Sequence, residues 1–255
     1  MWTGSIGFGL VNIPIKLYTA TQSSTLDLDM LDKSDNSHIK YMRVNESTGK
    51  EVPWENIVKG YKYDDRYIVL DDSDFEKANA KKTKLIEISD FVKAEEIDSL
   101  LYESSYYVAP DKSGVRAFYL LKEALQKTKK VGIASFVMRN KENLALLRPA
   151  DKLLILHRLH FAEEVRKAED IIILEQQEIK DKELEMAVTL INQLSGSFDI
   201  NQYKNTYTEE LMKLIEEKAK GLQIEEPKLK ITHSKSKDLM EQLKASLEVK
   251  RKKAS

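Results

Sequence analysis

The sequence has 255 residues, of which 42% are hydrophobic and 33% charged, with a net charge of −1 and no cysteine. This composition fits a folded protein with a sizeable core, and it excludes disulfides, cysteine nucleophiles and cysteine zinc sites. No apolar run approaches the roughly 18 residues of a membrane span, and the N-terminus lacks a signal-peptide pattern. We therefore expect a cytoplasmic location and no membrane partner.

Short strands separated by turns are predicted up to about residue 110, at 6–18, 38–44, 61–70, 85–92 and 105–109. A helix is predicted from Ser73, because Ser73 with Glu76 forms a capping-box pattern. A shorter helix is expected to open at Glu95 and run toward Leu101. Regularly spaced short strands favour a sandwich or a barrel.

From Ser113 the apolar spacing changes to that of a helix. Its buried face is predicted to hold Ala117, Leu120, Leu121, Ala124 and Leu125, with Arg116, Lys122, Lys127 and Lys129 largely away from it. Alternating residues then predict a hairpin, with strands at 131–139 and 144–148 around a turn at 140–143. A further strand is predicted over Leu153–Phe161, with Arg158 and His160 on the same face as Leu154 and Leu156.

Two helices are predicted after an acidic connection. The first covers 184–194 and is expected to end at Gly196, as glycine commonly ends helices. Thr206 with Glu209 predicts the cap of the second, which is expected to bury Leu211, Leu214 and Ile215 and to stop at Gly221. Beyond Pro227 come a polar linker, a short amphipathic helix with Leu239, Met240, Leu243 and Leu247, and a basic end, Lys250 to Lys253.

Charge is distributed unevenly along the chain. Residues 110–160 hold eleven Lys and Arg against four acidic residues, and residues 228–255 hold nine against three. Duplex DNA carries one charge about every 1.7 Å, so clustered cations favour sequence-independent binding to its phosphates. The candidate DNA-binding residues are Lys16, Lys127, Lys129, Lys130, Arg139, Lys141, Arg148, Lys250, Arg251, Lys252 and Lys253. Arg139 and Arg148 are favoured because strands hold a guanidinium firmly, and a solvated basic face is the alternative.

Two other classes of function are compatible with the residues. The aspartates between Asp64 and Asp74 suggest a metal-dependent nuclease, although carboxylates at turns and helix starts usually act as caps. His157 and His160 are three apart in a predicted strand and lie on opposite faces, which makes them poor co-ligands. A dimeric scaffold that does not bind DNA is the second alternative.

Several segments resemble the bacterial Ku family, in order along the chain. These segments are MWTGSIGFGLVNIPIKLYTA at 1–20, GKEVPWENIVKGY at 49–61, 91–107, 117–149, LHRLHFAEEVR at 156–166, 186–221 and DLMEQLKASLE at 238–248. The resemblance covers nearly the whole chain. Many relatives carry cysteines in a metal-knuckle pattern in the segment that corresponds to 32–52, and this chain has none there, so no metal and no cofactor is expected.

The resemblance implies an α+β fold with a Ku-type β-barrel core, a DNA-encircling bridge and C-terminal helices, assembled as a ring-shaped homodimer. It implies a core over 1–227, with the bridge hairpin at about 127–150 and a helical arm at about 183–221, and a C-terminal extension over 228–255. The implied function is non-enzymatic: sequence-independent binding to the ends of double-stranded DNA in non-homologous end joining, at the nucleoid. An ATP-dependent DNA ligase of the D type is the implied partner, contacted through Leu239, Met240, Leu243 and Leu247.

Overall fold

The computed structural model describes residues 1–78, 84–138, 141–175, 177–222, 242, 243 and 246. The chain divides into two compact units, one of Met1–Ser23 with Leu28–Asp170 and one of Ser24–Asp27 with Ile171–Ser255. This division falls inside the stretch 1–227 that the sequence suggests as one core. No helix in the described ranges is long and apolar enough to cross a membrane.

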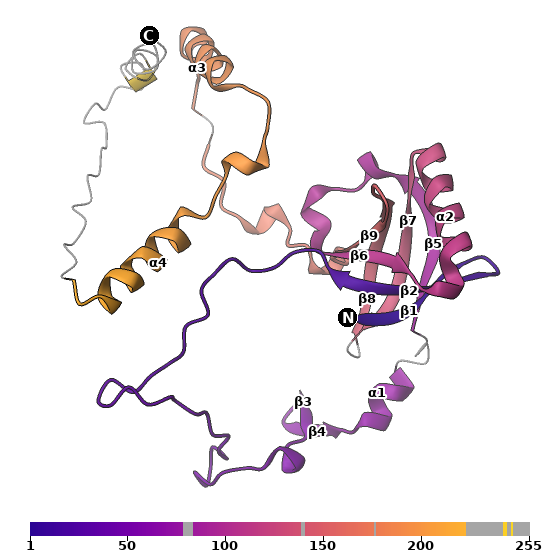
Figure 1. Cartoon of the computed structure of the whole chain (residues 1–255), viewed down its shortest axis with the longest axis vertical. Coiled ribbons are helices and arrows are strands. Elements are labelled where there is room, and N and C mark those ends of the chain that lie inside the picture. Colours follow the sequence, from indigo (N-terminus) through magenta and orange to yellow (C-terminus); the bar gives the residue numbers. More distant parts are fainter. Residues whose placement is uncertain (79–83, 139–140, 176, 223–241, 244–245, 247–255) are drawn as a thin grey trace. The chain divides into compact units, whose positions relative to one another are not determined.

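A closed barrel of seven strands forms the centre of the first unit (Figure 1), in the order β1-β2-β6-β9-β8-β7-β5. The strands are β1 (Trp2–Phe8), β2 (Val11–Thr19), β5 (Leu85–Lys93), β6 (Tyr102–Pro110), β7 (Lys130–Met138), β8 (Lys141–Pro149) and β9 (Leu154–Leu159). Neighbours are antiparallel except β1 and β5, which close the wall in parallel through Ser5–Gly7 and 85–87. Of the two architectures that the strand spacing favours, a sandwich and a barrel, the structure has the barrel.

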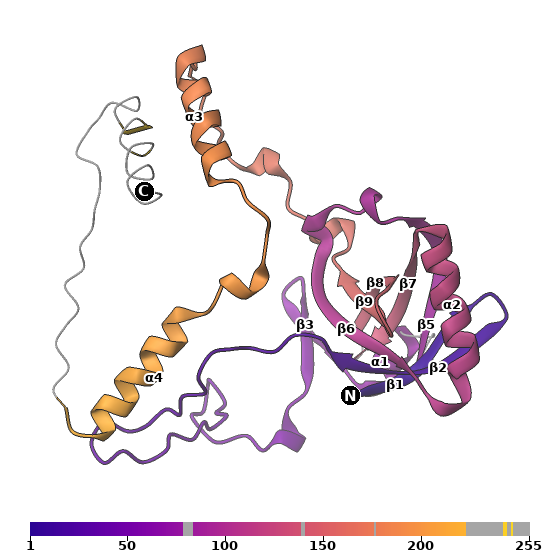
Figure 2. The same cartoon turned by 45° about the horizontal axis from the view of Figure 1, so that its top comes forward.

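The core lies inside this barrel and beneath helix α2 (Val115–Thr128), which packs against β2, β7 and β8 (Figure 2). Alternate residues of β2 point inward, so Ile13, Ile15 and Leu17 are buried. Removing apolar surface from water supplies most of the stabilisation of such a core.

The predicted strand 6–18 is wrong, because the structure divides this stretch between β1 and β2. Gly9 adopts a left-handed φ of 57° and allows a tight turn between the two strands. Leu10 stands at the turn fully exposed, at 107% of its reference area. The alternation of Ile6, Phe8 and Leu10 therefore does not continue as one buried face.

Helix α2 buries a face that differs from the predicted one. Leu120 is 69% exposed, whereas Phe118, Leu121 and Leu125 are buried together with Lys122. These four positions follow the i, i+3, i+4, i+7 spacing of one helical face, on which Phe118 is the largest side chain. Lys122 buries its aliphatic stem, and its Nζ donates a hydrogen bond to Gln126.

The hairpin predicted as a bridge, about 127–150, consists of two adjacent barrel strands. Residues Gly132 to Met138 of β7 pair with 141–147 of β8, and these strands lie between β5 and β9 in the wall. The long excursion from the barrel is instead the stretch between β2 and β5. The predicted strand over Leu153–Phe161 is confirmed but shorter, as β9.

The excursion between β2 and β5 holds a two-stranded hairpin, β3 (Lys59–Tyr63) with β4 (Arg66–Leu70), and a short helix α1 (Asp72–Ala78). The strand predicted at 38–44 is wrong. Two similar turns, each closed by a single bridge, occupy this region, Leu31 with His38 and Val44 with Glu51. In each turn an Asx side chain, Asp32 or Asn45, accepts backbone N–H bonds within the turn.

Two helices predicted in the first unit differ in the structure from what the sequence suggests. Helix α1 begins at Asp72, and the backbone N–H groups of Asp71 and Asp74 each donate to the other residue's carboxylate. Ser73 is therefore inside the helix rather than its cap. The helix expected between Glu95 and Leu101 is two 3-10 turns. The 3-10 turns of the chain are η1 (Trp54–Asn56), η2 (Ala94–Glu96), η3 (Ser99–Leu101), η4 (Lys112–Gly114), η5 (Ala162–Glu164), η6 (Ala168–Asp170) and η7 (Ile200–Gln202).

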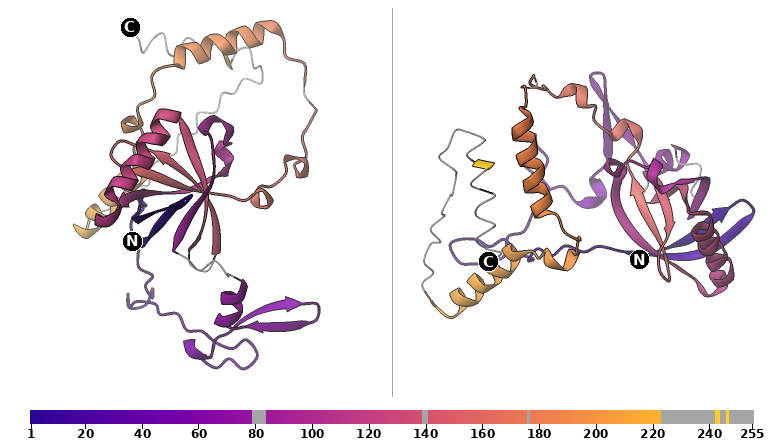
Figure 3. Two further views of the ribbon diagram at one scale, coloured as in Figure 1. Left: turned by 90° about the vertical axis from the view of Figure 1, so that its right-hand side faces the viewer. Right: turned by 90° about the horizontal axis from the view of Figure 1, so that it is seen from above.

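The second unit contains the helices α3 (Asp181–Leu194) and α4 (Thr206–Ala219), joined by a connection that includes η7 (Figure 3). Helix α3 ends at Leu194 with Ser195 as its C-cap, before the predicted Gly196. Asn205 caps α4 by accepting from the Thr208 N–H, in place of the predicted Thr206. Gly221 follows α4 with a left-handed φ of 73°, the conformation expected of a helix-ending glycine.

The burial predicted for α4 is wrong in this single chain. Leu214 is 38% exposed, Ile215 is also exposed, and Leu211 is half-buried. No side chain is classed as buried between 171 and 222 in the part of this unit that the structure describes. The apolar faces of both helices are thus open in one copy of the chain.

Candidate nucleic-acid interface

Basic residues gather where α2 ends and β7 begins. Lys127 lies in the last turn of α2, Lys129 is its C-cap with a left-handed φ of 54°, and Lys130 is the first residue of β7. All three are exposed. Cations near a helix C-terminus also interact favourably with the helix dipole, so Lys127 and Lys129 have a structural role beside any role in binding.

A shallow hollow brings three of the predicted DNA-binding residues together. It has a volume of about 420 Å³ and is lined by Leu125, Gln126, Lys129, Lys130, Val131, Arg148 and Pro149. Its cations come from two elements that are far apart in sequence, the α2–β7 junction and the end of β8. The fold therefore concentrates positive charge that the sequence distributes over about twenty residues.

Lys141 lies at the opposite end of the same hairpin. It is the first residue of β8, and it pairs with Met138 at the turn. Arg148 is seven positions further along the strand, which corresponds to about 23 Å. Lys141 is exposed but does not line the hollow.

Arg148 is fixed by a hydrogen bond to the next strand of the barrel. Its Nε donates to Nε2 of His157 over 2.8 Å, and Nδ1 of His157 is 2.8 Å from Oγ of Ser105. Burial, and after it the nearby charge of Arg148, lowers the pKa of His157 below its ordinary value. His157 is therefore neutral at neutral pH.

The neighbouring arginine on β9 is already paired with a carboxylate. Nη2 of Arg158 lies 2.8 Å from Oε2 of Glu103, and both side chains are partly buried. Lys16 likewise faces Asp111, with 3.7 Å between its Nζ and a carboxylate oxygen, and it lies on the outer face of β2 away from the hollow. A nearby carboxylate offsets the charge of Lys16, which weakens its case as a phosphate contact.

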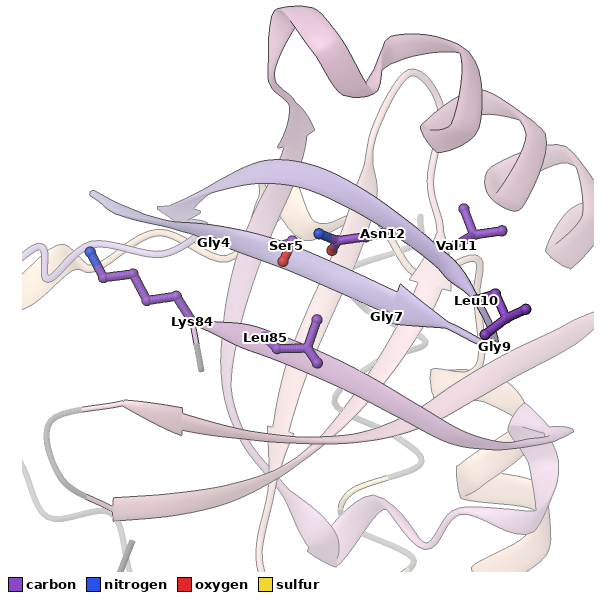
Figure 4. A pocket seen from close by; sticks show the side chains of 9 residues that line it. All are labelled: Gly4, Ser5, Gly7, Gly9, Leu10, Val11, Asn12, Lys84 and Leu85. Carbon is purple, nitrogen blue, oxygen red and sulfur yellow. The ribbon is translucent and has the colours of Figure 1, made fainter. Parts of the chain in front are cut away.

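A second hollow lies on the outside of the barrel, where β1 meets β5 (Figure 4). It measures about 400 Å³, and its lining extends from Lys84 at one end to Leu10 and Val11 at the other. Gly7 leaves part of its floor bare, and a Cβ there would lie 3.1 Å from the side chain of Leu85. This hollow contains none of the predicted binding residues.

The aspartates considered for a nuclease serve local structure. Asp71 and Asp74 form the cap of α1, and Asp64 occupies the β3–β4 turn with a left-handed φ of 50°. A hydrogen bond from Ser73, followed by one from the Asp74 N–H, lowers the pKa of Asp71. Among the residues that the structure describes, no three His, Asp or Glu side chains gather where they could hold a metal ion.

Several predicted site residues fall outside the described residues, namely Arg139, Leu239, Met240, Leu247, Lys250, Arg251, Lys252 and Lys253. Sequence reasoning missed Ser105 and considered His157 only as a metal ligand. The available signal was the alternation in β8 and β9, which places Arg148 and His157 on the outer face of adjacent strands. Pairing between those strands is a tertiary feature that one sequence does not specify.

Comparison with known proteins gives consistent matches. The family described as "Ku70/Ku80 beta-barrel domain" matches residues 7–186. A protein of Archaeoglobus fulgidus named "Non-homologous end joining protein Ku" is 42% identical over 249 residues, which cover 97% of each chain. Proteins of the same name from Opitutus terrae and Bacillus subtilis are 40% and 41% identical over 86% of this chain, and over 79% and 71% of their own lengths.

Proposed function

The chain belongs to the Ku family, and on this premise we propose that it binds the ends of double-stranded DNA in non-homologous end joining. The hollow with Lys129, Lys130 and Arg148 is the observation that carries the proposal. Phosphates attract such cations whatever the base sequence, so binding is sequence-independent. The chain acts without catalysis or cofactor of its own, at the nucleoid in the cytoplasm.

The binding form that we propose is a homodimeric ring. Support comes from the apolar faces of α3 and α4 and from the run Ile171–Leu174, in which Ile172 is 92% exposed. Exposed apolar surface of this extent is typical of interaction surfaces. A second copy would cover it, and the closed assembly would admit DNA only by threading over a free end.

Retention on two DNA topologies tests this proposal. The protein is mixed with a linear duplex or with the same sequence as a covalently closed circle, washed at increasing salt, and the bound fraction is measured. We expect retention on the linear form alone, with affinity falling steeply as salt rises. Equal retention on both forms contradicts the ring, and no retention on either favours a scaffold that works without DNA.

We further propose that the chain recruits and stimulates an ATP-dependent DNA ligase of the D type through Leu239, Met240, Leu243 and Leu247. Their spacing is that of a helix face that docks in an apolar groove. Replacing Leu239 and Leu243 with Asp should abolish ligase stimulation while the basic residues 250–253 and DNA retention stay intact. Unchanged stimulation would refute this role.

A further inference from the structure

The tautomer of His157 is determined by its two partners. An arginine has no acceptor atom, so the 2.8 Å bond requires that Nε of Arg148 donates and Nε2 of His157 accepts. The proton of the neutral ring is then on Nδ1, which donates to Oγ of Ser105. The ring thus links Ser105 on β6 to Arg148 on β8.

The backbone ladders keep this chain of hydrogen bonds in place. His157 pairs with Ser105 across β6–β9 and with Leu146 across β8–β9. Arg148 is two residues beyond Leu146 and so extends from the same outer face of β8. The ring of Tyr102 meets the imidazole edge-on, with centroids 5.1 Å apart, and limits its rotation.

Arg148 keeps its terminal nitrogens for another partner. Its only hydrogen bond in the described part of the chain uses Nε, and no carboxylate within that part forms an ion pair with it. Arg158, by contrast, gives its Nη2 to Glu103. An arginine oriented through Nε, with both Nη groups available, suits the bidentate recognition of a phosphate.

We propose that His157 is a positioning residue for DNA binding, which holds the Arg148 guanidinium at the edge of the basic hollow for a backbone phosphate. The inference rests on the proposed function, since it requires that Arg148 contacts DNA. Its physical content is pre-organisation: an arginine ordered before binding loses less rotamer entropy on contact. His157 itself touches no phosphate in this arrangement.

A double-mutant cycle tests the proposal with the full-length protein. Affinity for a fluorescent linear duplex of about 20 base pairs, two helical turns, is measured by anisotropy at fixed salt. His157→Phe keeps the ring but removes both nitrogens, and it should weaken binding about two- to tenfold, the range for ordering one long side chain. In an Arg148→Ala background the same change should have no further effect. His157→Gln, which keeps a donor and an acceptor, should restore part of the affinity.

Ser105→Ala is a milder variant for the case in which His157→Phe fails to fold, because it leaves the ring in place and removes only its orienting partner. Ser105→Ala should weaken binding when Arg148 is present, and it should have no effect in the Arg148→Ala background. Arg116→Ala is the control for the loss of one positive charge. Arg116 is exposed at the other end of α2. A loss of affinity that is equal with Arg148 present and in the Arg148→Ala background would overturn the positioning role.

Failure of the proposed function looks different from failure of this inference. Arg148→Ala should reduce the slope of log affinity against log salt by about one per chain that contacts DNA. If wild-type protein binds no duplex, or if Arg148→Ala changes neither affinity nor slope, the DNA contact itself is wrong. If Arg148→Ala has its effect but the His157 variants have none, only the positioning role is refuted.

Discussion

The barrel and the segments outside it differ in what they do with apolar side chains. Inside the barrel, residues such as Ile6, Leu147 and Leu156 are completely buried. In the described parts of 20–84 and 171–222, no side chain is classed as buried, although many are apolar. The barrel carries its own core, whereas the described parts of the other segments have apolar side chains that are exposed in one copy of the chain. We therefore expect substitutions in the barrel to change stability, and substitutions in the exposed apolar faces to change the proposed assembly.

Truncation of one leucine to alanine in each region should give the sharpest contrast between the two regions. Leu156→Ala removes a fully buried side chain and should lower the free energy of unfolding by about 2–5 kcal/mol. Leu28→Ala, at an exposed position in the excursion between β2 and β5, should change it by less than about 0.5 kcal/mol. Urea unfolding followed by circular dichroism measures both. An equal loss of unfolding free energy in the two variants would contradict the view that the barrel core provides most of the stability.

Charging the apolar face of α3 should affect assembly and leave the barrel folded. Val188→Asp with Ile191→Asp places two carboxylates on an exposed apolar stripe, which makes its burial costly. We expect sedimentation to show monomers and far-ultraviolet circular dichroism to show an intact barrel. Lys182→Glu changes the net charge equally on an exposed position of the same helix and should leave the dimer intact. Dimers that survive the double substitution would indicate that another surface joins the copies.

A smaller effect is expected from pH through His157. Its pKa is lowered in the folded chain, so the unfolded chain binds the proton more readily. Stability contributed by this group is complete above the ordinary histidine pKa of about 6.5, and it decreases as pH falls from there to the lowered folded value. Between about pH 7.5 and about pH 5.5, wild-type protein should lose more thermal stability than His157→Gln. Parallel losses in the two proteins would show that His157 does not titrate in this way.

The elements of the barrel could largely be predicted from the sequence, because alternation and helical spacing are local. The division at Gly9 could not, since a glycine in a strand pattern indicates a turn, a bulge or a close approach equally well. Leu120 is expected to be buried and is exposed, and Lys122 is expected to be exposed and is buried. Two adjacent faces of the helix both fit the apolar spacing. The spacing of apolar residues thus predicts where helices and strands lie, and tertiary packing determines which of their faces is buried.

For the site, charge clustering identified Lys129, Lys130 and Arg148, which the fold brings to one hollow. The partners that distinguish one cation from another were not predictable. Arg148 meets a neutral histidine, while Arg158 and Lys16 meet carboxylates. Such pairings depend on which strands become neighbours, and here β8 and β6 flank β9.

The mass of the complex with a duplex of about 20 base pairs, close to 68 Å long, tests the central claim most directly. We expect one duplex held by two chains, and we expect this complex to be lost when bulky caps close the duplex ends before the protein is added. A complex with one chain per duplex, or two chains bound equally well to capped DNA, would contradict an encircling dimer.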